Sequence, residues 1–190
     1  YANHMKVLQM LAHNSKSEDR RWVLKCPAHL GFVKDIRAVF PAGTKIIWTH
    51  RNPNESLPSL CSLFQTFQEM HEGGDIKLDE LGQKTLELWS AMIKRADADF
   101  TASSADSSHV KYTNLVKDPI GTVKEVYAEF GWEYTDEYDA ALKAYLEENR
   151  KEREKIKGSA KKMHSYSLEQ YALSEEQMQE KFGWYNAKYL

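Results

Sequence analysis

The sequence predicts an α/β protein with a short parallel sheet and many helices, and three observations support this class. Residues 21–64 read as strand, helix, strand and helix in succession, which is the pattern of a βαβ unit. A basic or imidazole side chain stands wherever a strand ends and a helix begins. Helical periodicity of apolar residues then dominates the rest of the chain. Because open α/β sheets bind ligands outside the carboxyl ends of their strands, we expect functional residues at these strand ends.

The first half of this unit begins with a short apolar run at residues 22–24, which predicts a strand. Pro27 cannot extend a strand ladder, so the strand is expected to end before it. Lys25 and His29 therefore lie at or just beyond its carboxyl end. Apolar residues spaced by three and four then predict a helix over residues 29–40.

The second half repeats the pattern more strongly. Residues 45–49 are rich in β-branched and aromatic side chains and predict a strand. Asn52 is a good N-cap and Pro53 suits the first helical position, so a helix should follow. Arg51 then lies beside a helix amino terminus, where free N–H groups and the helix dipole favour an anion. Ser59 follows two turns into the helix and can add a hydroxyl, so the unit predicts a site for a nucleotide phosphate or similar anion.

Several short stretches resemble the middle of a bacterial-type sulfotransferase that uses 3′-phosphoadenosine 5′-phosphosulfate (PAPS); they are residues 24–30, 40–41, 48–53 and 58–63. The resemblance implies a three-layer sandwich like that of P-loop NTPases. It also implies that Arg51 and Ser59 hold the 3′-phosphate of PAPS. His29 would be the general base, and Lys25 would stabilise charge on the transferring group. Two alternatives to these roles remain open. His29 could cap its own helix, and Arg51 could form a surface salt bridge.

Two later stretches also resemble the family. Residues 110–112 predict a short strand, and residues 110–119 have a tyrosine ahead of a leucine and then Asp-Pro, which implies that Tyr112 lies against the adenine. A tyrosine that simply fills the end of a strand stays open as an alternative. Residues 163–169 resemble the family's carboxyl-terminal segment, which folds over the phosphate of the cofactor. This implies cofactor-binding roles for Lys161, Lys162, His164 and Tyr166.

The basic run at residues 150–162 has a second interpretation. It holds seven cations and two carboxylates, and such runs commonly form a solvated helix end that complements the helix dipole. The Gly-Ser-Ala-Lys at residues 158–161 is no Walker loop, because it lacks the preceding strand and the required spacing.

The totals of the sequence restrict the class of protein. With 190 residues and 42% hydrophobic composition, we expect residues 1–190 to form one domain that corresponds to the carboxyl-terminal two-thirds of the family fold. The net charge of −2 gives no case for nucleic acid as a partner. Two cysteines without a CxxC motif argue for neither a disulfide framework nor zinc, and a reducing, cytoplasmic location is expected. No apolar run is long enough to predict a transmembrane segment.

One departure from the family pattern affects the predicted activity. Family members begin with a strand and a Pro-x-Ser-Gly-Thr-like loop that binds the 5′-phosphosulfate, and this sequence contains no such loop. We therefore expect an N-terminally truncated fold, with the absent segment removed or supplied by a second chain, or else a degenerate relative. Such a chain should bind the 3′-phosphate without a full sulfate site and turn over little alone.

The predicted function is transfer of a sulfuryl group from PAPS to a hydroxyl or amine of an acceptor, without a metal. The acceptor is a small molecule or a glycan or lipid that the sequence does not identify. Two other classes stay open. A P-loop kinase or NTPase would share the layers, but neither a Walker A nor a GxGxxG motif is present. A non-catalytic, helix-rich interaction module would bind a protein and ignore adenosine 3′,5′-bisphosphate.

Overall fold

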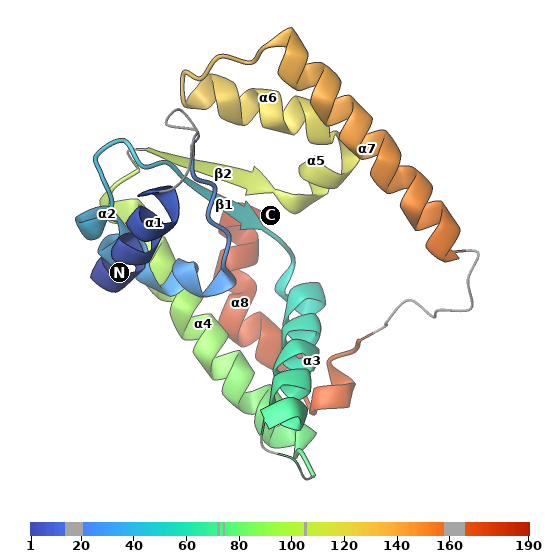
Figure 1. Cartoon of the computed structure of the whole chain (residues 1–190). Coiled ribbons are helices and arrows are strands. Elements are labelled where there is room, and N and C mark those ends of the chain that lie inside the picture. The colour runs from blue at the N-terminus through green and yellow to red at the C-terminus, as the bar shows by residue number, and fades with distance from the viewer. Residues whose placement is uncertain (14–20, 72, 74, 105, 158–165) are drawn as a thin grey trace. The chain divides into compact units, whose positions relative to one another are not determined.

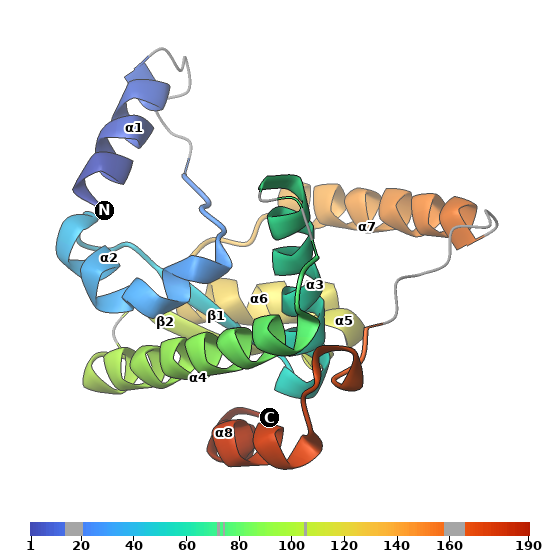
Figure 2. The same ribbon diagram turned by 90° about the horizontal axis from the view of Figure 1, so that it is seen from below.

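The computed structural model describes residues 1–13, 21–71, 73, 75–104, 106–157 and 166–190. Figures 1 and 2 show its elements, which in chain order are α1 (Ala2–His13), η1 (Pro27–Phe32), α2 (Val33–Val39), β1 (Ile46–His50), α3 (Pro53–His71), α4 (Leu78–Ala102), β2 (Ser107–Lys111), α5 (Tyr112–Lys117), α6 (Pro119–Glu129), α7 (Asp136–Lys157), η2 (Glu169–Tyr171) and α8 (Glu175–Tyr189).

The chain divides into two compact units, which are described separately. Unit 1 comprises Tyr1–Trp48 and Leu88–Ser107, and unit 2 comprises Thr49–Glu87 and Ser108–Leu190. The division therefore falls inside both strands and inside α4.

Strands β1 and β2 pair in a two-stranded parallel sheet. Along β1, Trp48 and His50 are buried while Ile47 and Thr49 are exposed, as the period of two in a strand requires. The predicted α/β class with a short parallel sheet and many helices is thus confirmed. The expected strand at residues 45–49 and the helices that follow it are also found.

Unit 1 packs η1 and α2 against the second half of α4. Gly31 allows η1 to approach α4 closely, because a Cβ at this position would lie 3.2 Å from the methyl carbon of Met92. Arg37 links α2 to the end of α4 by donating to the carbonyl oxygen of Asp99 at 3.0 Å. Trp48 stacks on Phe100 with ring centroids 5.1 Å apart, so the first half of β1 completes this small core.

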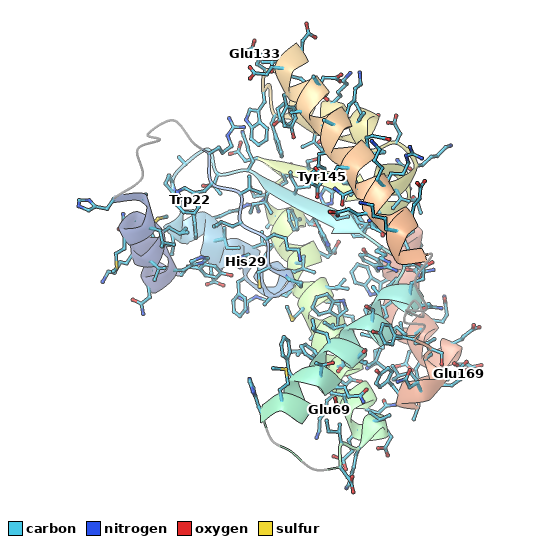
Figure 3. All side chains as sticks on the ribbon, turned by 45° about the vertical axis from the view of Figure 1, so that its right-hand side comes forward. Trp22, His29, Glu69, Glu133, Tyr145 and Glu169 are labelled. Carbon is cyan, nitrogen blue, oxygen red and sulfur yellow. The ribbon has the colours of Figure 1, made fainter. Side chains whose placement is uncertain are left out.

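The strand expected at residues 22–24 does not form, and that prediction was wrong. Trp22 is 51% exposed and Val23 is 86% exposed, in an extended segment without regular structure (Figure 3). A strand is stable only when its N–H and C=O groups pair with a neighbour. Within the described ranges, the sheet holds only β1 and β2, so nothing pairs with residues 22–24.

Unit 2 has a core between α3, the first half of α4, η2 and α8. Leu57, Leu86 and Phe182 are among its fully buried side chains. Gly82 permits close contact with η2, because a Cβ there would clash with the carbonyl oxygen of Tyr171. Helix α8 begins with a capping box, in which Ser174 and Gln177 bond each other's backbone N–H.

Helices α6 and α7 pack side by side within unit 2 (Figures 1 and 2). Asp118 caps α6, since its carboxylate accepts from the N–H of Gly121 at 2.8 Å. Gly131 follows the end of α6 and has a φ of +64°, which glycine adopts without strain. Asp139 of α7 pairs with Lys143 at 2.6 Å and with Lys124 of α6 at 3.0 Å, and the hydrogen bonds from Lys143 first and Lys124 second lower the pKa of its carboxyl.

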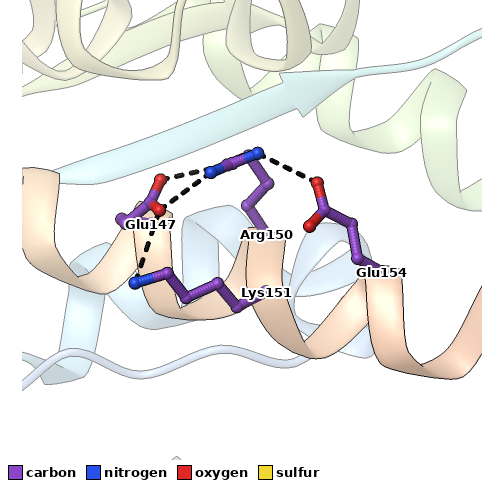
Figure 4. A network of polar contacts seen from close by, with 4 residues as sticks. All are labelled: Glu147, Arg150, Lys151 and Glu154. Carbon is purple, nitrogen blue, oxygen red and sulfur yellow. Dashed lines mark hydrogen bonds and ion pairs between the residues drawn. The ribbon is translucent and has the colours of Figure 1, made fainter.

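Charged side chains along α7 pair with one another (Figure 4). Arg150 bonds Glu147 at 2.8 Å and Glu154 at 2.9 Å, and Lys151 lies 3.5 Å from Glu147. The hydrogen bond from Arg150 is the main cause that lowers the pKa of Glu147. All four residues are exposed, so this described part of the basic run has the properties of a solvated helix.

Candidate functional site

Arg51 lies in the short turn between β1 and α3, in unit 2. Asn52 begins the turn into the helix, because its side-chain oxygen accepts the backbone N–H of Asn54 at 3.0 Å. Leu57 and Cys61 face the core, and this fixes the orientation of α3. The amino terminus of a 19-residue helix is therefore anchored immediately after Arg51, and its N–H groups favour an anion there.

The Arg51 guanidinium lies over the ring of Tyr112, with 4.9 Å between its central carbon and the ring centroid. A cation over an aromatic face is attracted by the ring quadrupole. The side chain of Arg51 is 41% exposed, and its ion pair to Glu55 is long, at 3.4 Å, and itself exposed. Such a pair contributes little, so a phosphate can replace Glu55 at the guanidinium.

Tyr112 is the first residue of α5, directly after β2. The sequence placed it in the strand, and the structure ends that strand one residue earlier. It remains 36% exposed beneath Arg51. Two parallel strands thus deliver an arginine and a tyrosine to the same edge, which is how residues distant in sequence come together in an α/β fold.

The remaining cofactor-binding predictions fall in different places. Ser59 is exposed on α3. Tyr166 is 36% exposed and lies ahead of η2. Lys161, Lys162 and His164 lie outside the described residues. The structure therefore brings Arg51 and Tyr112 into contact and leaves the other assignments as predictions.

The two predicted catalytic residues belong to unit 1. Lys25 is exposed, just before η1. His29 is half-buried in η1, where its Nδ1 lies 2.8 Å from the hydroxyl of Tyr1. The ring of His4 stacks on it, with centroids 5.7 Å apart. Burial, and secondarily the neighbouring His4, lower the pKa of His29, which favours the neutral imidazole that a general base requires.

Sequence reasoning missed the surroundings of His50. The Nδ1 of this residue lies 3.0 Å from the hydroxyl of Tyr185, far along the chain. Its Nε2 lies 2.8 Å from Nδ1 of His109. Two signals could have pointed here: His50 shares the buried face of β1 with Trp48, and Tyr185 and Tyr189 are four residues apart on one helix face.

The described residues contain neither a helix long and apolar enough to cross a membrane nor a group of three or more His, Cys, Asp or Glu placed to hold a metal ion.

The fold defines an α/β protein with an exposed arginine at the turn between β1 and α3, and comparisons with known proteins assign the class. The family model described as "Sulfotransferase family" matches residues 1–136. The chain therefore belongs to the sulfotransferase family. No curated protein matched this sequence.

Two solved structures have the same fold. Sulfotransferase STF1 from Mycobacterium tuberculosis H37Rv is similar with a TM-score of 0.74 at 31% identity, over 96% of this chain and 44% of that chain. Sulfotransferase STF9 from Mycobacterium avium has a TM-score of 0.76 at 21% identity, over 95% of this chain and 44% of that chain. This chain thus spans less than half the length of either solved protein.

Proposed function

We propose that this chain binds the adenosine 3′-phosphate part of PAPS and serves in the transfer of its sulfuryl group to a hydroxyl or amine. The observation that carries the proposal is the exposed Arg51 guanidinium, which lies over Tyr112 at the amino terminus of α3. A guanidinium can bond two phosphate oxygens at once, and the helix N–H groups add to the attraction. Family membership supports sulfuryl transfer as the reaction class.

The residues present fit a nucleotide with a 3′-phosphate. Arg51 loses only a long, exposed pair to Glu55 when it turns to a phosphate. Tyr112 has exposed ring surface on which an adenine can lie, and aromatic stacking of a base contributes about 1–3 kcal/mol. Ser59 and Tyr166 are exposed and supply hydroxyls, and Lys161, Lys162 and His164 are proposed to add cations and a further hydrogen-bonding group.

The catalytic roles proposed for this chain rest on His29 and Lys25. PAPS supplies the activated sulfuryl group when it is bound. A neutral imidazole at His29 accepts the proton of the acceptor hydroxyl or amine, a step that commonly contributes about 10²–10⁴-fold. The ammonium of Lys25 is exposed and able to stabilise negative charge that develops during transfer. The acceptor class remains a small molecule or a glycan or lipid.

The test is a calorimetric titration of the whole chain with adenosine 3′,5′-bisphosphate, and with adenosine 5′-monophosphate as the comparison ligand. We expect the bisphosphate to bind at least about tenfold more tightly, because the charged hydrogen bonds to the 3′-phosphate contribute roughly 1.5–3 kcal/mol. Arg51→Ala should remove this preference.

A matched control is available in unit 1. Arg95 also pairs with a carboxylate, Asp35 at 3.0 Å, and lies over an aromatic ring, that of Phe32 at 5.4 Å. Arg95→Ala should therefore leave the preference for the bisphosphate intact. Equal affinities for the two ligands in the wild-type chain would refute the proposal.

A further inference from the structure

His29 of η1 (Figure 3) is held at one of its two ring nitrogens. Its Nδ1 lies 2.8 Å from the hydroxyl oxygen of Tyr1, and both residues belong to unit 1. Within the described part of the chain, Nε2 of the same ring has no hydrogen-bond partner. The proposed base therefore has one nitrogen engaged by a hydroxyl and one nitrogen left for an acceptor.

The hydroxyl of Tyr1 is held in place by the surroundings of its ring. The ring centroid lies 5.6 Å from that of His29, 6.1 Å from that of Phe32 and 6.1 Å from that of Phe40. The carbonyl oxygen of Tyr1 accepts the N–H of Met5 at 2.9 Å, which ties its main chain to the first turn of α1. The direction of the hydroxyl toward the imidazole is thus set by packing on both elements.

The imidazole of His29 is also fixed from its main chain and from one face. Its N–H donates to the carbonyl oxygen of Cys26 at 3.1 Å, which closes the turn that begins η1. The ring of His4 stacks on it, with 19° between the two planes, and itself meets the edge of Phe40 at 5.9 Å. Helix α1 and the residue before it therefore meet the imidazole at one face and at Nδ1.

The position of one hydrogen decides whether this imidazole can act as a base. A hydroxyl and a neutral imidazole can each donate or accept, so a distance of 2.8 Å allows either direction. If Tyr1 donates to Nδ1, the ring hydrogen lies on Nε2, and Nε2 cannot take up a proton. If Nδ1 donates to Tyr1, the lone pair lies on Nε2. The proposed role of His29 requires the second arrangement.

A tyrosine hydroxyl suits this arrangement because it is neutral. Burial is the main cause that raises the pKa of the Tyr1 hydroxyl, so the group beside Nδ1 keeps its proton. A carboxylate in the same place would raise the pKa of the imidazole through its charge. The hydroxyl orients the ring without this effect, which agrees with the lowered pKa of His29.

We propose that Tyr1 is a positioning residue for His29: its hydroxyl oxygen accepts the hydrogen on Nδ1, and this directs the lone pair of Nε2 to the acceptor hydroxyl or amine. The inference rests on the proposed role of His29 as general base. When the proton of the acceptor moves to Nε2, the ring becomes an imidazolium whose Nδ1–H still donates to Tyr1. One hydrogen bond therefore serves both charge states of the ring.

The test compares Tyr1→Phe with Tyr185→Phe in the whole chain. Tyr1→Phe keeps an aromatic ring at the site and removes the hydroxyl. Tyr185 is a matched control, because its hydroxyl lies 3.0 Å from Nδ1 of a different histidine, His50. The tautomer of His29 is read from the ¹⁵N shifts of its ring nitrogens at about pH 8.5, well above the ordinary histidine pKa of about 6.5. Cooperative urea unfolding shows that each variant is folded.

We expect the wild-type ring of His29 to carry its hydrogen mainly on Nδ1. Tyr1→Phe should lower the ratio of this tautomer to the Nε2–H tautomer about tenfold, equal to about 1.4 kcal/mol. Tyr185→Phe should leave this ratio unchanged while it alters the ¹⁵N shifts of His50. A Tyr1 that only packs among its aromatic neighbours would leave the ratio unchanged in Tyr1→Phe, and that result would overturn the inference.

The outcomes separate this inference from the proposed function. Titration with adenosine 3′,5′-bisphosphate tests Arg51, whereas the ¹⁵N shifts test the bond between Tyr1 and His29. If the chain binds the bisphosphate but wild-type His29 carries its hydrogen on Nε2, the proposed function stands and the inference is overturned. If the chain binds no bisphosphate, the proposed function fails, and the tautomer of His29 still decides whether Tyr1 directs the lone pair of Nε2.

Discussion

Trp22 and Trp48 occupy the same place in two similar stretches of sequence, yet they have opposite environments. Trp48 is 6% exposed, stacked on Phe100 in a paired strand. Trp22 is 51% exposed in an extended segment that is not part of the sheet formed by the described residues. Both tryptophans precede a basic residue and a helix, so the two stretches have a similar local propensity to form a strand. The difference shows that a strand depends on a pairing neighbour, which a local sequence pattern does not reveal.

The histidines that follow these two stretches differ in the same way. His29 is half-buried, and its Nδ1 lies 2.8 Å from the hydroxyl of Tyr1. His50 is fully buried and bonded through both nitrogens. A catalytic base needs a ring nitrogen that a substrate can reach, whereas a histidine engaged at both nitrogens can only hold other groups in place. The comparison favours His29 as the proposed catalytic base and His50 as a residue that holds its neighbours in place.

The largest expected effect separates the two tryptophans. Trp48→Ala should lower the free energy of unfolding by about 3–5 kcal/mol, because it leaves a cavity beside Phe100. Trp22→Ala should change it by less than about 0.5 kcal/mol, as is usual at exposed positions. Denaturant unfolding of both variants measures the difference. Equal losses would mean that Trp22 is packed in the folded chain, against its 51% exposure.

The next effect concerns pH and His50. Burial, then His109 and Lys111, lower the pKa of His50 to about 3 from an ordinary value of 6.5. Between these values the unfolded chain binds more protons, so this contribution to stability is complete above pH 6.5 and is lost as the pH falls toward 3. The free energy of unfolding should therefore fall by about 1 kcal/mol per pH unit in this range on account of His50.

Urea unfolding of His50→Asn between about pH 4 and pH 7 measures this contribution. The variant should show a correspondingly shallower dependence on pH than the wild-type chain, since asparagine does not titrate. His71→Asn, at an exposed histidine of the same unit, serves as the control and should keep the wild-type slope. The same slope in His50→Asn would contradict the assignment of a neutral, buried His50.

The smallest effect concerns His29. Burial and the stacked His4 lower its pKa, so His4→Asn should move that pKa back toward its ordinary value. An NMR titration of the His29 ring protons gives the midpoint directly. His13→Asn removes an exposed histidine at the other end of α1 and should leave the midpoint in place. An unmoved midpoint in His4→Asn would show that His4 does not influence the proposed base.

Local chemistry explains what could be predicted from the sequence. Asn52, Asp118 and Ser174 each cap a helix because a short polar side chain next to free N–H groups needs no distant partner. The strand before Arg51 was predictable from its β-branched and aromatic residues and from the turn that follows it. The family resemblance implied separate cofactor-binding roles for Arg51 and Tyr112, and the structure places the two side chains in contact.

Contacts between distant parts of the chain explain what could not be predicted. The bond between His50 and Tyr185 joins residues 135 positions apart, and no periodicity in the sequence links them. The Tyr1 hydroxyl at His29 is a similar case. The absent strand at residues 22–24 depends on a partner and not on composition, so the local pattern suggested an element that the structure does not contain.

The central claim is that the turn after β1 binds the 3′-phosphate of an adenine nucleotide, and thermal unfolding tests it most directly. A ligand that binds only the folded chain raises the midpoint, and at about one hundred dissociation constants it adds about 2.7 kcal/mol. We predict that adenosine 3′,5′-bisphosphate raises the midpoint of the wild-type chain, that adenosine 5′-monophosphate raises it much less, and that Arg51→Ala abolishes the difference. An identical midpoint with and without the bisphosphate, in a chain that unfolds cooperatively, would contradict the claim.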